Sequence, residues 1–158
     1  MSKNAIFRKS LEGYVLPLAD CGGGCYENLV KAIAQLPIGI KLVNNSKHAD
    51  VVFIAGIITH AAAPRLKEEF AGLSKPCFIV KIGSCMGKAN KRFEEPSQNY
   101  AVNETTKKFF PINLAVDGCP PSVDDIISKL ETFINYLDLT PEISKTLDGK
   151  LDKSIFSP

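Results

Sequence analysis

A run rich in Val, Ile and Phe at residues 50–57 constrains the fold more than any other part of the sequence. Apart from its first residue, the run contains no polar side chain. Such a run is typical of a β-strand whose two faces are both covered. Strands of this kind belong to parallel sheets that lie between layers of helices. We therefore expect an α/β fold built on a mainly parallel sheet.

The rest of the chain alternates between strand and helix patterns. Four more apolar segments are expected to form strands, at residues 13–19, 39–43, 77–82 and 112–116. Apolar residues recur at helical spacing in three segments between or after them, at 26–36, 64–73 and 122–138. In the last segment, Ser122 can cap the helix together with Asp125 three positions later. This alternation indicates βαβ units and helices on both faces of the sheet.

The chain of 158 residues has the size of one domain. We expect that domain to span residues 1–138, followed by a polar tail at 139–158. The net charge of +2 is small and the basic residues are scattered, so the sequence does not indicate nucleic-acid binding. The longest apolar stretch, at 49–58, has about half the length of a membrane span. No export signal opens the sequence, and we expect a cytoplasmic location.

Five cysteines in a chain without an export signal favour metal or redox chemistry over a disulfide framework. Cys21, Cys85 and Cys119 each follow an expected strand, and Cys25 ends the glycine loop that begins at Cys21. In parallel sheets, ligands bind outside the carboxyl ends of the strands. The sequence therefore predicts that these four thiols converge at one edge of the sheet.

Glycines accompany each of these four cysteines. Three separate Cys21 from Cys25, and single glycines lie close before the other two cysteines. Because glycine lacks a side chain, its backbone can approach a bound group closely. The loop at 21–25 also precedes a helix N-terminus, whose amides favour negative charge. The candidate cofactor-binding glycines are Gly22, Gly24, Gly83 and Gly118.

The cysteines admit several interpretations. All four could be buried apolar fillers, since cysteine is among the most buried residue types. Structural zinc sites usually take their cysteines in two close pairs, and here only Cys21 and Cys25 are close. Dispersed thiols with neighbouring glycine amides suit an iron–sulfur cluster better. Cys77 lies inside an expected strand, where a core role is favoured over a ligand role.

Three polar residues near these segments have more ordinary interpretations. Glu27 follows the glycine loop and could relay protons, but stabilising the first turn of a helix is at least as plausible. His48 and His60 stand alone beside the third expected strand, and surface positions are expected for both.

Several motifs occur in an order that matches a known superfamily. The motifs are Cys-Gly-Gly-Gly-Cys-Tyr-Glu at 21–27, Ala-Asp-Val-Val at 49–52 leading to Gly-Ile-Ile-Thr at 56–59, Ala-Pro-Arg-Leu at 63–66, Gly-Ser-Cys at 83–85 and Gly-Cys-Pro-Pro at 118–121. On these motifs, over about residues 13–137, the chain resembles the small subunit of [NiFe] hydrogenases and its homologue, the B-type subunit of respiratory complex I.

The resemblance implies a flavodoxin-like domain that holds one [4Fe-4S] cluster through Cys21, Cys25, Cys85 and Cys119. It implies a subunit without catalytic residues of its own, which passes electrons to the NiFe site of a larger partner. The electron donor would be a ferredoxin-like iron–sulfur subunit or a ferredoxin. The assembly would be cytoplasmic, with membrane subunits as further partners if it lies on the cytoplasmic face of a membrane.

Two features bear on the branch of the superfamily. Complex I subunits carry adjacent cysteines in the first motif and hydrogenases separate them by two residues, whereas three residues separate Cys21 from Cys25 here. Asp117 replaces a proline that usually precedes the glycine of the last motif, which would alter hydrogen bonding or cluster potential but not ligation. The pattern is nearer to short, energy-converting hydrogenases. The alternatives are a complex I-like subunit that delivers electrons to a quinone and a binding module with structural zinc.

Overall fold

The computed structural model describes residues 11–16, 18, 24–37, 39–56, 58–73, 77–84 and 112–139. Five strands form one parallel sheet in the order β2-β1-β3-β4-β5. Their bounds are Leu11–Leu16 for β1, Ile40–Leu42 for β2, Val51–Ala55 for β3, Phe78–Ile82 for β4 and Leu114–Val116 for β5. This strand order is that of flavodoxin-like folds. The predicted fold class is therefore confirmed.

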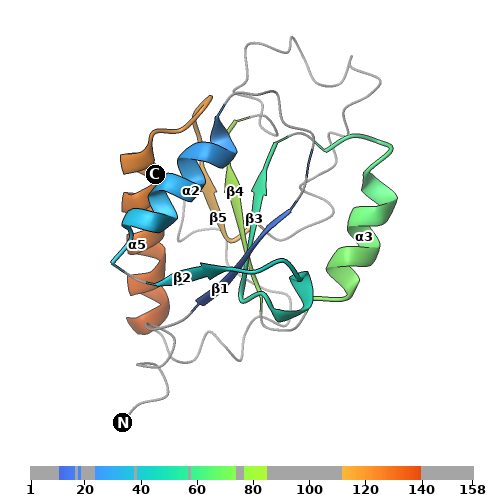
Figure 1. Cartoon of the computed structure of the whole chain (residues 1–158), viewed down its shortest axis with the longest axis horizontal. Helices are drawn as coiled ribbons and strands as arrows, with labels where there is room; N and C mark the ends of the chain where they lie inside the picture. Colours follow the sequence, from blue (N-terminus) through green and yellow to red (C-terminus); the bar gives the residue numbers. More distant parts are fainter. Residues whose placement is uncertain are drawn as a thin grey trace.

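Helices cover both faces of the sheet, as Figure 1 shows. Helix α2 (Cys25–Gln35) and helix α5 (Val123–Leu139) pack together on one face. Helix α3 (Ala63–Ala71) lies on the other face. A short 3₁₀ helix, η1 (Ser46–His48), precedes β3 and was not expected from the sequence. All three predicted helices are present, with ends shifted by one or two residues.

Strand β3 is buried along its whole length, as its composition predicts. Its alternate residues serve two separate cores. Val51, Phe53 and Ala55 pack toward α2 and α5, whereas Val52 and Ile54 pack toward α3. This central strand therefore joins the two layers of helix to one sheet.

The ends of β1 differ from the prediction. The strand begins at Leu11 rather than at residue 13, because Leu11 pairs with Ile40 of β2 and is buried in the core beneath α2 and α5. It ends at Leu16, directly before Pro17, and proline has no backbone N–H to continue the ladder. The apolar pattern alone did not reveal this shift.

Ser122 caps α5 as predicted. Its hydroxyl accepts a hydrogen bond from the Asp125 amide at 3.1 Å and donates one to the Asp125 carboxylate at 2.6 Å. The helix continues through Leu139, one residue beyond the predicted domain boundary. The division into a domain at 1–138 and a tail stays a prediction, since residues 140–158 lie outside the described part.

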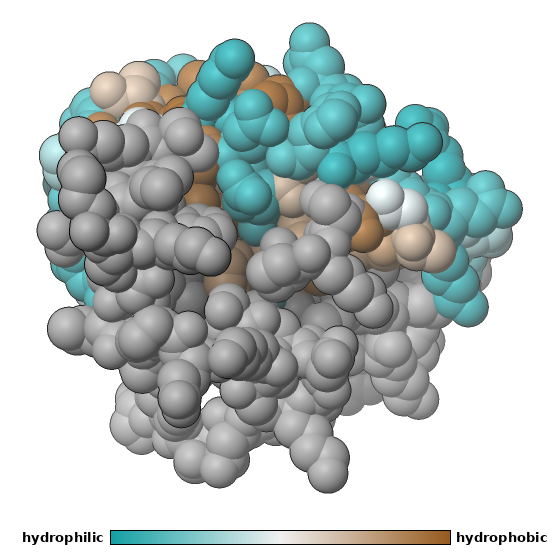
Figure 2. Space-filling model, turned by 90° about the horizontal axis from the view of Figure 1, so that it is seen from below, coloured by the Kyte–Doolittle hydropathy of each residue, from teal (hydrophilic) through white to brown (hydrophobic). Residues whose placement is uncertain are grey.

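The carboxyl ends of β3, β4 and β5 and the start of α2 lie together in the upper part of Figure 1. Figure 2 views the molecule from below and thus shows the opposite end. Among the coloured residues of that face, hydrophilic ones predominate, with smaller apolar areas between them. The carboxyl edge, by contrast, is the end at which the sequence predicts the cysteines and a bound group.

Replacing Phe53 tests the central role of β3. Phe53→Ala is expected to lower the free energy of unfolding by about 3–5 kcal/mol, because the side chain is completely buried and its loss leaves a cavity. Urea unfolding followed by circular dichroism measures the change. Lys129→Ala on the exposed face of α5 is the control and should change stability by less than about 0.5 kcal/mol. Equal effects of the two variants would contradict the assignment of the core.

Candidate functional site

Cys25 is the first residue of α2 and is only 3% exposed. Gly24 precedes it as the N-cap, in a left-handed conformation. The first amides of a helix have no partner within the helix, and the helix dipole adds partial positive charge at this end. The fold therefore places a buried thiol where negative charge is favoured.

The end of β4 lies directly against this thiol. A Cβ atom added at Gly83 would lie 2.9 Å from Sγ of Cys25, a distance that real Cβ atoms do not adopt. Gly83 also has φ +92°, a conformation that other residues rarely take. Only glycine can occupy this position without a shift of Cys25. The observed close neighbour of Gly83 is the Cys25 thiol, and the expected approach of Gly83 to a bound group stays a prediction.

Gly118 forms a second tight turn, after β5. Its φ is +146°, and an added Cβ would lie 2.5 Å from Cα of Pro121. Because the neighbouring atoms belong to backbone, they cannot move aside easily. The turn presents Cys119 as an exposed side chain.

Hydrogen bonds tie the turns after β4 and β5 to each other. The Gly83 amide donates to Val116 O at 2.8 Å, which extends the ladder beyond the strands. Ser84 then makes two bonds with Gly118: its amide donates to the Gly118 carbonyl, and its hydroxyl accepts from the Gly118 amide, each at 2.8 Å. Ser84 is buried and had no role in the sequence prediction. Its place in the sequence between Gly83 and Cys85 was the one feature that could have indicated a role at the site.

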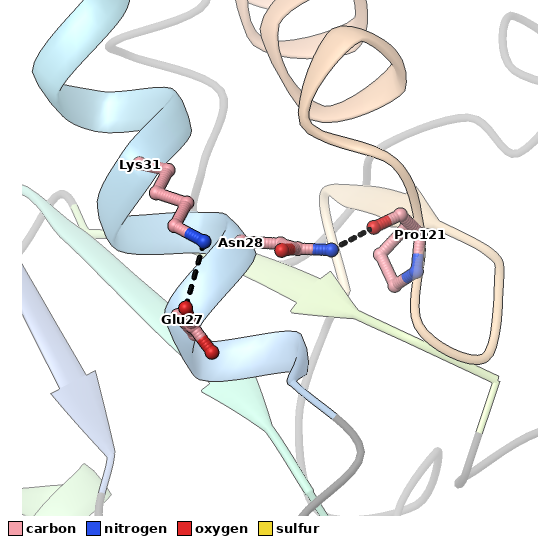
Figure 3. A network of polar contacts seen from close by, with 4 residues as sticks. All are labelled: Glu27, Asn28, Lys31 and Pro121. Atoms are coloured by element: carbon pink, nitrogen blue, oxygen red, sulfur yellow. Dashed lines mark hydrogen bonds and ion pairs between the residues drawn. The ribbon is translucent and has the colours of Figure 1, made fainter.

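Asn28 ties the start of α2 to the Cys119 turn. Its side-chain Nδ2 donates to the carbonyl of Pro121 at 2.9 Å, as Figure 3 shows. An added Cβ on Gly24 would lie 3.9 Å from Cγ of Pro120, so the two segments also adjoin at the N-cap. The start of α2 and the ends of β4 and β5 therefore form one connected edge.

Glu27 forms an exposed ion pair with Lys31 one helical turn later, at 2.7 Å (Figure 3). The hydrogen bond from Lys31, together with its positive charge, lowers the pKa of the Glu27 carboxyl. The pair supports the exposed side of the first turn, in agreement with the structural interpretation of Glu27.

Not every predicted site residue lies in the described part of the chain. Cys21, Gly22 and Cys85 lie outside it, whereas Gly24, Cys25, Gly83, Gly118 and Cys119 are described. Within the described residues, no three potential ligand side chains gather at one point. The four-cysteine ligand set therefore stays a prediction.

The described residues nevertheless fit a group bound through thiols. Cys25 and Cys119 belong to two segments of the same edge, held together by Asn28. Gly83 lies so close to the Cys25 thiol that no side chain would fit between the two. A soft, sulfur-ligated metal or cluster suits such a donor set.

The remaining cysteine and the two histidines lie elsewhere, as predicted. Cys77 is half-buried directly before β4 and packs against the core beneath α3. His48 and His60 are exposed. These positions favour structural or surface roles for all three residues.

Together, fold and site define a class of α/β domain that presents cysteine thiols at the carboxyl edge of a parallel sheet. The chain belongs to the family described as NADH ubiquinone oxidoreductase, 20 Kd subunit, whose sequence model matches residues 16–133. The resemblance inferred from the motifs is thereby confirmed at the level of the family.

Two curated relatives represent two branches of oxidoreductase. A probable membrane-bound hydrogenase subunit of Pyrococcus furiosus is 28% identical over 89 residues, which cover 56% of this chain and 51% of the relative. The B-type subunit of the NADH-quinone oxidoreductase of Azobacteroides pseudotrichonymphae is 32% identical over 84 residues, which cover 53% of this chain and 42% of the relative. The matches thus span about half of these relatives or less.

A solved structure shares the fold. A chain in the structure of the membrane-bound sulfane sulfur reductase, an archaeal respiratory membrane complex, aligns with a TM-score of 0.66. The alignment covers 88% of this chain and 76% of that chain, at 17% identity. In the described part of the present chain, no helix is long and apolar enough to cross a membrane.

Gly83→Ala tests the close approach at Cys25. The added methyl would meet the Cys25 thiol in an unfavourable backbone conformation, so the free energy of unfolding should fall by about 1–3 kcal/mol. Gly72→Ala is the control, since its Cβ would make only ordinary contacts and its φ of −89° suits alanine. That variant should change stability by less than about 1 kcal/mol in urea unfolding. Equal losses in both variants would refute the close approach.

The environment of Cys77 predicts slow alkylation. Burial, reinforced by the nearby negative charge of Asp50, raises the pKa of the Cys77 thiol to about 11. A raised pKa keeps the thiol protonated at pH 8, and the thiolate is the nucleophile. Iodoacetamide should therefore label Cys77 slowly at pH 8 and faster as the pH rises toward 10, as followed by mass spectrometry of the apo chain. The exposed Cys119 is the reference, and equal rates at pH 8 would contradict the prediction.

Proposed function

We propose that this chain is the electron-transfer small subunit of a [NiFe] hydrogenase, with one proximal [4Fe-4S] cluster bound to Cys21, Cys25, Cys85 and Cys119. The observation that carries the proposal is the contact of Gly83 with the buried Cys25 thiol, beside the turn that presents Cys119. Similarity to a probable membrane-bound hydrogenase subunit supports the hydrogenase branch. When bound, the cluster would supply one-electron transfer.

The residues of this chain would position and shield the bound group. Cys25 is buried, so its side of the site excludes water. Ser84 and Asn28 hold the ligand-bearing turns through hydrogen bonds of 2.8 and 2.9 Å. Cys119 is exposed, which leaves the opposite side accessible to a partner subunit. Cys21 and Cys85 complete the set by their place in the sequence motifs.

The proposed partner subunits would have separate roles in catalysis and in electron supply. A larger subunit with the NiFe site would carry out H2 oxidation or proton reduction, and a ferredoxin-like subunit or a ferredoxin would exchange electrons with this chain. The chain would have no catalytic residue of its own. The name of the Pyrococcus furiosus relative supports an assembly at a membrane, which we place on the cytoplasmic face with membrane subunits as further partners.

A complex I-like function, with electrons passed to a quinone, is the second candidate. It is favoured by the 32% identity to the B-type subunit of an NADH-quinone oxidoreductase. Nickel content of the anaerobically purified complex, together with H2-dependent dye reduction, separates the two functions. Nickel with H2 uptake would establish the hydrogenase, whereas iron and sulfide without either would favour the quinone branch. Zinc without acid-labile sulfide would exclude both and leave a binding module.

Cysteine substitutions test the proposed ligands. Cys25→Ser and Cys119→Ser should each lose or convert the cluster, because serine oxygen is a poorer ligand for iron–sulfur clusters than thiolate. Iron and acid-labile sulfide per chain, with the visible absorption spectrum, measure the loss. Cys77→Ser is the matched control and should retain the wild-type content, since Cys77 packs beneath α3. The same loss in all three variants would show that the ligand assignment is wrong.

A further inference from the structure

Lys81 is a buried cation in an otherwise apolar strand. Strand β4 has the sequence Phe-Ile-Val-Lys-Ile, and all five residues are buried. Lys81 itself is only 6% exposed. Moving an ammonium group out of water costs several kcal/mol unless an oppositely charged partner compensates for the lost hydration. An apolar residue would fit the strand pattern at this position, so the lysine needs a separate explanation.

The partner of Lys81 lies on the turn that carries Cys119. Nζ of Lys81 is 2.9 Å from Oδ1 of Asp117. In the sheet register Lys81 pairs with Ala115, so Asp117 lies two residues further toward the carboxyl end. Two residues of strand span about 6.6 Å. The side chain of Lys81 therefore runs along the sheet and places its ammonium at the edge of the candidate site.

The two charges differ in their exposure to water. The Lys81 side chain is 7% exposed, whereas that of Asp117 is 67% exposed. Water and salt screen the charge of an exposed carboxylate much more than that of a buried ammonium. The pair therefore produces a net positive electrostatic potential at the groups around it. Asp117 lies two residues before Cys119 on the same turn, and Lys81 comes four residues before Cys85 in the sequence.

We infer that Lys81 is a positioning residue that holds the Asp117–Cys119 turn and that the Lys81–Asp117 pair sets the reduction potential of the group bound there. This inference rests on the proposed function. A group that accepts one electron becomes more negative, so a nearby buried cation favours its reduced form. Removal of Lys81 should make reduction harder, and removal of the Asp117 charge should make it easier.

Two variants that are expected to shift the midpoint potential in opposite directions test the inference. Lys81→Met removes the charge but retains an unbranched side chain only one atom shorter, and it should lower the midpoint potential, whereas Asp117→Asn should raise it. The potentials are measured on the full chain with its cluster, anaerobically, by redox titration with dithionite as the electron donor and electron paramagnetic resonance as the readout. The double variant should fall between the two single variants.

Lys31→Met is the matched control, because Lys31 forms a similar ion pair with Glu27 but is exposed. Its midpoint should stay at the wild-type value, since both charges of the Lys31–Glu27 pair are exposed and screened, whereas Asp117 is paired with a buried ammonium. If Lys81→Met does not fold, Asp117→Asn alone decides, because its side chain lies mostly in water. A midpoint at or below the wild-type value in Asp117→Asn would overturn the inference.

Iron and sulfide content separates this inference from the proposed function. Wild-type protein without iron and sulfide would overturn both. Wild-type protein with a cluster, but with shifts of the same sign in the two single variants or with no shifts, would leave the proposed function intact and refute the role of the pair. A purely structural role would lower cluster content in both variants without opposite shifts in potential.

Discussion

The contact between the Cys25 thiol and Gly83 is the constraint on which the described site depends. A helix start can lie this close to a strand end only where the strand residue has no side chain, because a Cβ at Gly83 would lie 2.9 Å from Sγ. Once α2 is fixed against β4, the neighbouring turn after β5 is fixed by backbone hydrogen bonds to Gly83 and Ser84. The absence of a side chain at Gly83 thus allows the start of α2 and the end of β4, which are far apart in the sequence, to lie in contact.

The described site residues can be compared with the usual ligand position in doubly wound sheets. Ligands of such sheets commonly bind where the strand order reverses, which here is between β1 and β3. The described site residues come instead from the start of α2 and from the ends of β4 and β5. Helix α2 packs against α5, which begins shortly after the Cys119 turn, so these segments lie together.

The sequence predicted the fold better than the details of the site. Strand β3 and the Ser122 cap were predictable because burial and capping act through local patterns. The start of β1 at Leu11 was not, because it depends on pairing with Ile40 across the sheet. Ser84 and Asn28 were missed for the same reason: their partners lie 34 and 93 residues away in sequence, and neither residue breaks its local pattern.

Lys81 does break its pattern, and the structure gives the break a physical meaning. The apolar run of β4 suggested only a core strand, yet its one charged residue is nearly as buried as its neighbours. Asp117 is a separate departure, from the proline of the last motif. The two unusual residues, Lys81 and Asp117, form an ion pair with each other at 2.9 Å. A proline at 117 would have no carboxylate, so it would leave a buried ammonium without this partner at a considerable cost in stability. Each of the two residues therefore explains the presence of the other, and their ion pair lies at the edge of the sheet that carries the thiols.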